Sequence, residues 1–195
     1  MNDQQIKHIL AYLGVDAHPP SLPALDALLS AYTRHVPWES ISRIARKSRA
    51  SDYRHAHLMP DAFWQSAITN GTGGTCYESN YAFLTFLKHL GYEGYLTLNN
   101  MHEHISCHSA IIIHLDGINY LVDAGMPFHV AIPIQTDQQT SRRGEFHTHI
   151  ITPQGADVYL IERDHHPSRY CYHLINKPIA EADYQTTLIN DYADG

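Results

Sequence analysis

The chain has 195 residues, of which 44% are hydrophobic and 17% charged, a composition typical of a folded globular protein rather than a disordered one. The formal net charge of −7 argues against general nucleic-acid binding, because phosphate contacts need clustered lysine and arginine. No segment approaches the roughly 18 apolar residues of a membrane span, and "MNDQQIKHILAYLGV" (1–15) contains no apolar region of signal-peptide length. With only three cysteines, too few for a disulfide scaffold, we expect a reduced, cytoplasmic protein with no membrane or nucleic-acid partner.

Residues 1 to about 90 have the pattern of helices. The segment "DQQIKHILAYLG" (3–14) carries apolar side chains at helical spacing and ends on Gly14. A second helix is expected after Ser21, a typical N-cap residue. The cationic segment "SRIARKSR" (42–49) is expected to be a solvated helix face, and "MPDAFWQSAITNG" (59–71) a further helix.

Residues 93 to about 175 have the pattern of short strands rich in Ile, Val, Tyr and Thr. Turn residues separate them at Asp116-Gly117 and at Pro153-Gln154-Gly155. Helices followed by strands predict an α+β protein. We expect a helical domain over 1–90 and an antiparallel β-barrel or sheet domain over 91–195. The predicted strand segments are "EGYLTLN", "HSAIIIHL", "INYLVDA", "GEFHTHIIT" and "ADVYLIER".

Cys76 stands where a glycine-rich turn meets an amphipathic run that ends at Gly91. Thr75 and Glu78 have the spacing of a capping box, which predicts Thr75 as N-cap and Cys76 as the first helical residue. A thiol in the first helical turn faces free N–H groups and the positive end of the helix dipole, which favour the reactive thiolate. The alternative is that Cys76 is a small buried residue at an ordinary helix start.

A nucleophilic cysteine needs a base, usually histidine, held by a third group. Asp116-Gly117 predicts a hairpin with a two-residue loop. In that register Ala110 is opposite Asp123, and His108 lies diagonal to Asp123 on the same face, within reach of a hydrogen bond. A three-residue loop would place His108 and Asp123 on opposite faces instead.

Sixteen histidines are an unusual number for this length. The residues His102, His104, Cys107 and His108 lie close together in sequence, and zinc favours such ligands. No CxxC or HExxH motif accompanies them, so we expect no metal, and a metal-binding protein stays an alternative to an enzyme.

The motifs resemble those of the arylamine N-acetyltransferases. The family's Gly-Gly-aromatic-Cys-aromatic-Glu-x-Asn motif is matched by residues 73–80, "GGTCYESN". Its His-x-Pro-Phe-Glu-Asn motif is matched by "HVPWES" (35–40), and its Tyr-Leu-Val-Asp-x-Gly-Phe-Gly segment by "NYLVDAGMPF" (119–128). The blocks occur in the family's order between residues 10 and 135, and more weakly to about 190.

The resemblance implies a Cys-His-Asp triad of Cys76, His108 and Asp123 on a core similar to the papain-like cysteine proteases. It also implies that Trp38 and Met126 contact substrate. The implied reaction is ping-pong transfer of an acetyl group from acetyl-CoA, a co-substrate rather than a bound cofactor, to an aromatic amine or hydrazine. An amide synthase or a thiol hydrolase could use the same triad, and an inactive relative is a further alternative.

The sequence also departs from the family. Thr72 stands where the family usually has arginine, Thr75 where it has an aromatic residue, and Pro127 where it has the last glycine of Gly-Phe-Gly. The family normally continues into a C-terminal α/β region that covers the cleft and helps to bind coenzyme A. This chain stops at "LINDYADG", so we expect a core that lacks this lid.

Overall fold

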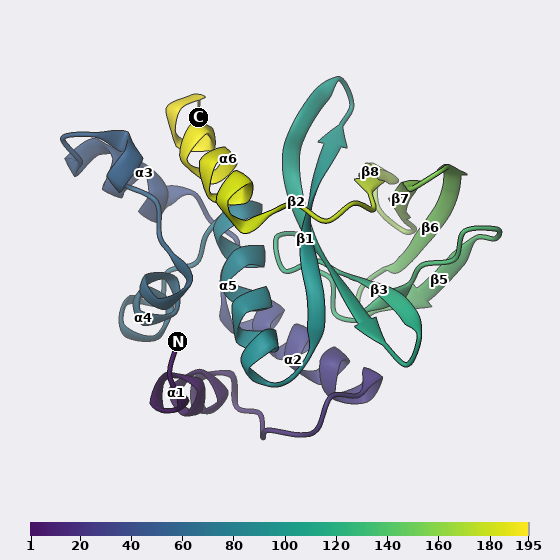
Figure 1. Ribbon diagram of the computed structural model, residues 1–195, viewed down its shortest axis with the longest axis horizontal. Coiled ribbons are helices and arrows are strands. Elements are labelled where there is room, and N and C mark those ends of the chain that lie inside the picture. The colour runs from purple at the N-terminus through teal and green to yellow at the C-terminus, as the bar shows by residue number, and fades with distance from the viewer. Residues whose placement is uncertain (195) are drawn as a thin grey trace.

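The computed structural model describes residues 1–194, and its first part is helical (Figure 1). Apolar stripes and caps explain the boundaries. Asn2 and Gln5 form a capping box at the first helix, and Ser21 accepts the Ala24 N–H at the second. Gly14 ends the first helix in the left-handed conformation. The helices are α1 Asp3–Leu13, α2 Leu22–His35, α3 Ile41–Arg49, the short 3-10 helix η1 Tyr53–His55, α4 Pro60–Asn70 and α5 Cys76–His89.

The second part of the chain forms an antiparallel sheet with the strand order β4-β3-β2-β1-β8-β7-β6-β5. Its edge strands β4 and β5 approach each other, and the Thr140 hydroxyl donates to the Pro133 carbonyl between them. The sheet is therefore nearly closed into a barrel, and the predicted order of helices followed by an antiparallel sheet is confirmed. The strands are β1 Glu93–Met101, β2 His104–Leu115, β3 Ile118–Val122, β4 Ile132–Pro133, β5 Thr140–Arg143, β6 Thr148–Gly155, β7 Val158–Arg163 and β8 Tyr170–Ile175.

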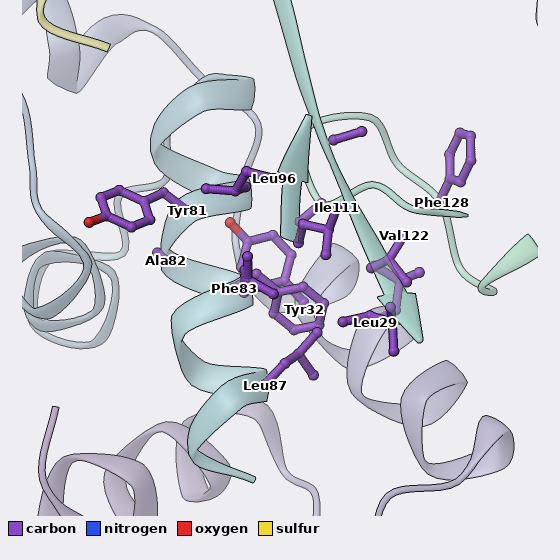
Figure 2. Packing of buried hydrophobic residues seen from close by; sticks show 14 of the residues in the cluster. Leu29, Tyr32, Tyr81, Ala82, Phe83, Leu87, Leu96, Ile111, Val122 and Phe128 are labelled. Atoms are coloured by element: carbon purple, nitrogen blue, oxygen red, sulfur yellow. The ribbon is translucent and has the colours of Figure 1, made fainter. Parts of the chain in front are cut away.

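Helix α5 joins the two parts because it packs against α4 on one side and against β1 and β2 on another (Figure 1). The ring centroids of its Phe83 and of Tyr32 from α2 are 4.9 Å apart, and Figure 2 shows Leu87 of α5 and Ile111 of β2 in the same group of buried side chains. All four side chains are at most 1% exposed, and burying each such side chain contributes roughly 1.5–3 kcal/mol. The helix that begins at Cys76 is thus held in place by the helical part of the chain on one side and by the sheet on the other.

Several features differ from the sequence prediction. The strand expected over 144–152 begins only at Thr148, and β4, β5 and β8 are strands that the sequence did not predict. Strand β6 continues through Pro153 and Gln154, and the turn falls at Ala156–Asp157, where Asp157 has a φ of 60°. The chain also ends in a helix, α6 Glu181–Asp194, which packs beside η1 rather than extending the sheet. The division into domains at residues 90 and 91 stays a prediction. In the part of the chain that the structure describes, no helix is long and apolar enough to cross a membrane.

Candidate active site

The glycine pair before Cys76 is packed against the segment that follows α2. A Cβ atom added to Gly73 would lie 1.6 Å from the carbonyl oxygen of Pro37, so only glycine fits there. Beside it, Trp38 and Gly74 form an isolated parallel bridge. The two motifs that are distant in sequence therefore meet, and their contact fixes the loop that leads into Cys76.

The carboxylate of Glu39 strengthens this contact. It accepts the Gly73 N–H at 3.1 Å, the Ser42 N–H at 2.8 Å and the Ser42 hydroxyl. Burial raises the pKa of Glu39, but these hydrogen bonds outweigh it and lower the pKa overall. Glu39 thus links the start of α3 to the loop before the cysteine as a charged group.

Cys76 is the first residue of α5, as the sequence predicts. It is half-buried, and its Sγ lies 3.9 Å from the carbonyl oxygen of Cys107 on β2. The predicted capping box is wrong, however. Thr75 has the extended backbone of an N-cap residue, but its side chain makes no capping hydrogen bond.

Glu78 is not available for the capping box because its buried carboxylate binds elsewhere. It accepts hydrogen bonds from the Arg46 guanidinium at 2.8 Å, the Leu58 N–H at 2.7 Å and the Tyr192 hydroxyl at 2.5 Å. Its side chain is fully buried and that of Arg46 only 21% exposed. The segment 42–49 is therefore a helix, as predicted, but not simply a solvated face. Its Arg46 neutralises a buried charge next to the first turn of α5.

The β2–β3 hairpin has the predicted two-residue loop. Asp116 and Gly117 both have positive φ, and Leu115 pairs with Ile118. This register brings His108 to Asp123, with 2.7 Å between His108 Nε2 and Asp123 Oδ2. His108 is 4% exposed and Asp123 is completely buried.

Several further donors surround the Asp123 carboxylate. Oδ1 accepts the N–H groups of Gly125 and Met126, each at 3.0 Å, and the Asn80 side chain at 3.2 Å. Oδ2 accepts the Tyr172 hydroxyl at 2.9 Å, in addition to His108. The buried carboxylate is thus fully hydrogen-bonded, and its orientation toward the imidazole is fixed.

Asn80 connects the nucleophile helix with β2 and with the segment that follows β3. Its Nδ2 donates to the Ser109 carbonyl at 2.7 Å as well as to Asp123, and its Oδ1 accepts the Ala124 N–H at 2.9 Å. The sequence indicated no such role for Asn80, although its position four residues after Cys76 places both on one helix face. Tyr172 was missed as well, and nothing local in β8 points to Asp123.

The electrostatics of the site favour a charged imidazole. Burial by itself lowers the pKa of His108, but the charge of Asp123, the charge of Cys76 and hydrogen bonds to both raise this pKa well above the usual value. Because Asp123 uses Nε2, Nδ1 is the ring nitrogen left for the thiol. An imidazolium beside a thiolate is the pair that nucleophilic cysteine chemistry requires.

Cys76 and His108 line an open cavity of about 600 Å³. The predicted substrate contacts Trp38 and Met126 line it too, and Trp38 is 64% exposed, so it is not a core residue. Thr72 does not line this cavity, and its hydroxyl lies 2.7 Å from the Ser66 hydroxyl. The other lining residues are Arg43, Thr75, Met101, Cys107, Gly125, Pro127, Arg163 and Asp191.

The histidine-rich segment 101–108, which spans the β1–β2 turn and the start of β2, does not converge on one point. His108 binds Asp123, whereas the ring of His102 lies 4.5 Å from that of Tyr170. Among the residues that the structure describes, no group of three or more His, Cys, Asp or Glu side chains is arranged to hold a metal ion.

Solved structures of similar fold are arylamine N-acetyltransferases. The enzyme from Mycobacterium abscessus is 19% identical with a TM-score of 0.78, over 96% of this chain and 69% of that one. Arylamine N-acetyltransferase C from Bacillus anthracis is 17% identical with a TM-score of 0.78, over 99% and 76%. The NAT3 enzyme from Bacillus cereus, described with a unique Cys-His-Glu catalytic triad, is 20% identical with a TM-score of 0.74, over 95% and 74%. The chain thus has the arylamine N-acetyltransferase fold.

The family follows from the sequence comparison. The model of the N-acetyltransferase family matches residues 21–193, most of the chain, whereas no curated protein matches the sequence. The chain therefore belongs to the arylamine N-acetyltransferase family and is an acyltransferase. The expected likeness to papain-like proteases and the expected lack of the C-terminal lid stay predictions.

Proposed function

We propose that this protein moves an acetyl group from acetyl-CoA to an aromatic amine or hydrazine through an acyl-cysteine on Cys76. The observation that supports this most directly is the hydrogen bond between His108 and Asp123, in a cavity that Cys76 also lines. Together with the Cys76 charge, it favours the imidazolium form that a thiolate nucleophile needs. The acetyl donor is a co-substrate, and no tightly bound cofactor takes part in the proposal.

In the first step the Cys76 thiolate attacks the thioester carbonyl carbon, and the CoA thiolate leaves with the proton of the His108 imidazolium. Asp123 holds the imidazole in one orientation and stabilises its positive charge. In the second step the neutral imidazole removes a proton from the attacking amine, and Cys76 leaves as thiolate. Two half-reactions that share one acyl-enzyme predict ping-pong kinetics.

The oxyanion of each step needs preorganised donors close to the cysteine. The first turn of α5 offers backbone N–H groups that lack intrahelical partners, and Thr75 does not cap them. Trp38 and Met126 would contact the acceptor ring, since both line the cavity beside Cys76. The relative from Bacillus cereus is described with glutamate as the third residue. Here that role would fall to Asp123.

The proposal is tested by intact-mass spectrometry after incubation with acetyl-CoA. Wild-type protein should gain one acetyl group, which an added aromatic amine removes, and Cys76→Ala should gain none. Cys171→Ala is the matched control, because Cys171 is buried away from the cavity, and it should be acetylated like wild type. Iodoacetamide labelling of Cys76 without any acetyl transfer would contradict acetyl-CoA use and favour an amide synthase or thiol hydrolase with the same triad.

A further inference from the structure

The cavity beside Cys76 contains a second thiol that the acyl-transfer mechanism does not use. Cys107 immediately precedes His108 in β2, is half-buried and lines the same cavity as Cys76. The third cysteine, Cys171, is 2% exposed and does not line this cavity. All three are free thiols. Two cysteines therefore share the catalytic cavity, and the third lies outside it.

Two contacts place Cys107 beside the first turn of α5. The Sγ atom of Cys76 lies 3.9 Å from the carbonyl oxygen of Cys107, and covalent geometry puts that oxygen only two bonds from the Cys107 Cα atom. The hydroxyl of Tyr77, the residue after Cys76, donates to the carbonyl of Ser106, the residue before Cys107. The segments that carry the two thiols are thus neighbours, although 31 positions separate them in the sequence.

Strand β2 is irregular where it carries Cys107. The β1–β2 register is interrupted between its pairs at His108 and His104, so Cys107 lies in a β-bulge, and Ser106 has a left-handed φ of 53°. The Cys107 thiol donates to the His104 carbonyl over 3.4 Å, a weak bond because S–H is a poor donor. The regular ladder does not hold Cys107, and its side chain can rotate toward Cys76 at small cost.

The two thiols differ in reactivity. Cys76 stands at the start of a helix and beside the His108 imidazolium, and both settings favour the thiolate. An accessible thiolate is the form that peroxides oxidise to sulfenic acid, and a neighbouring thiol then condenses with that product. Cys76 has the surroundings of the thiol that is oxidised first, and Cys107 has the position of the thiol that condenses with it.

We propose that Cys76 and Cys107 form a dithiol site that peroxides convert into a reducible disulfide. In the first step the Cys76 thiolate attacks one peroxide oxygen, so that an S–O bond forms and the O–O bond breaks. The other oxygen leaves as water or an alcohol with the proton of the His108 imidazolium. In the second step the Cys107 sulfur attacks the sulfenic sulfur, the S–S bond forms and the S–O bond breaks. The hydroxyl group leaves as water with the Cys107 proton, and the peroxide has then oxidised both thiols together by two electrons.

The disulfide blocks the nucleophile but also preserves it. A sulfenic acid that meets no thiol is oxidised further to sulfinic and sulfonic acids, which thiol reductants do not reverse. A disulfide between Cys76 and Cys107 stops this sequence, and thiol–disulfide exchange with a reductant restores both thiols. The inference concerns control of the nucleophile by oxidation, and it goes beyond the proposed acyl transfer and its two substrates.

The test follows Cys76 in wild type, Cys107→Ser and Cys171→Ala during prolonged treatment of dilute protein with excess hydrogen peroxide. Cys76 is then labelled with iodoacetamide before and after reduction by dithiothreitol. Wild type should lose its labelling and regain most of it after reduction, and its peptide map should contain a reducible link between the Cys76 and Cys107 peptides. Cys107→Ser should lose its labelling without regaining it and should gain oxygen atoms on Cys76.

Cys171→Ala is the matched control, because Cys171 does not line the cavity, and it should behave like wild type. Each variant is compared with its own labelling before peroxide is added, so an effect of the substitution on folding is measured separately. In wild type, a link from Cys76 to Cys171, a link between two chains, or oxidation of Cys76 without any link would overturn the proposal. Recovery of labelling in Cys107→Ser to the wild-type extent would overturn it as well.

The proposed function and the dithiol site fail in different measurements. If wild type forms the link between Cys76 and Cys107 but acetyl-CoA never acetylates Cys76, the acyl transfer is wrong and the dithiol site stands. If acetyl-CoA acetylates Cys76 but peroxide produces no such link, the dithiol site is wrong and the acyl transfer stands.

Discussion

Gly125 lies directly against the backbone of Cys76. A Cβ atom added to Gly125 would come within 2.4 Å of Cys76 Cα and 2.6 Å of Cys76 Cβ, far closer than any real contact. Gly125 follows two residues after Asp123 and donates its N–H to that carboxylate at 3.0 Å. The absence of a side chain at this position therefore sets the distance between the nucleophile helix and the strand end that holds Asp123.

Gly125→Ala should separate the helix from the strand end. We expect a loss of stability of about 1–3 kcal/mol from overpacking and a marked fall in the rate at which iodoacetamide labels Cys76. Urea denaturation and labelling kinetics measure the two effects. Gly144→Ala is a suitable control, since its Cβ would approach no atom closer than 3.3 Å. Unchanged labelling in Gly125→Ala would show that the contact does not position Cys76.

Asn80→Asp tests the connection between α5 and the hairpin. The new carboxylate would lose the donor to Ser109 and face Asp123 at the position where Asn80 now binds it at 3.2 Å. We expect a loss of roughly 3 kcal/mol or more, the usual cost of an uncompensated buried charge, measured by urea denaturation. Asn2→Asp is the control, because Asn2 is an N-cap residue where both side chains serve equally well.

Local sequence signals predicted the parts of the site that depend on neighbouring residues. The start of α5 at Cys76 follows from the glycines before it and the apolar run after it. The meeting of His108 and Asp123 follows from the two-residue Asp116-Gly117 loop, since strand geometry then fixes which side chains share a face. Both predictions depend only on residues that lie close together in the sequence.

The parts that sequence could not predict depend on contacts between distant segments. Glu78 has the spacing of a capping box, yet it binds Arg46, which lies 32 residues earlier, and Tyr192, which lies 114 residues later. Asp123 meets Tyr172, 49 residues away. Residue spacing carries no information about such partners. Glu78 therefore forms an ion pair with Arg46 instead of the capping box that its spacing from Thr75 predicts.

The pH dependence of the site should follow His108. Its raised pKa means that the imidazolium is present below the usual histidine value of about 6.5 and persists above it. The stabilisation that its pairing with Asp123 provides is therefore complete below that value and is lost as pH rises through the raised pKa. Nitrogen NMR of the ring should show His108 titrating above its ordinary range.

Asp123→Asn removes the charge that raises the pKa of His108, while the burial that lowers it stays. The His108 pKa should fall below that of wild type in the same NMR titration. His114→Gln, an exposed histidine on the same strand, serves as the control. An unchanged His108 titration in Asp123→Asn would contradict the electrostatic account.

Arg46→Met should destabilise the protein because it leaves the buried Glu78 carboxylate without its cation. We expect the free energy of unfolding to fall by about 3–5 kcal/mol, the usual effect of removing one partner of a buried ion pair. The double variant Arg46→Met with Glu78→Gln should regain part of that loss, because no buried charge is left. Urea denaturation of the single and double variants measures the coupling. Arg49→Met on the exposed part of α3 should change stability by less than about 0.5 kcal/mol.

His149 on β6 should make the protein sensitive to mild acid. It is 3% exposed, its ring stacks 3.8 Å from that of Phe128, and its Nδ1 has no hydrogen-bond partner among the described residues. Burial, together with the charge of His147, lowers its pKa to about 4. The folded state therefore keeps His149 neutral, whereas the unfolded chain binds a proton below a pH of about 6.5. Stability contributed by the neutral ring is present above that pH and is lost toward 4, by at most about 1.4 kcal/mol per pH unit.

His149→Leu removes the titrating group but keeps an apolar side chain beside Phe128. The variant should lose less stability than wild type between pH 7 and pH 5, as measured by urea denaturation at both values. His114→Leu, which changes an exposed histidine, should keep the wild-type difference. If His149→Leu and wild type lose the same free energy over this range, the acid sensitivity arises elsewhere, and the unpaired ring nitrogen of His149 has no measurable effect on folding.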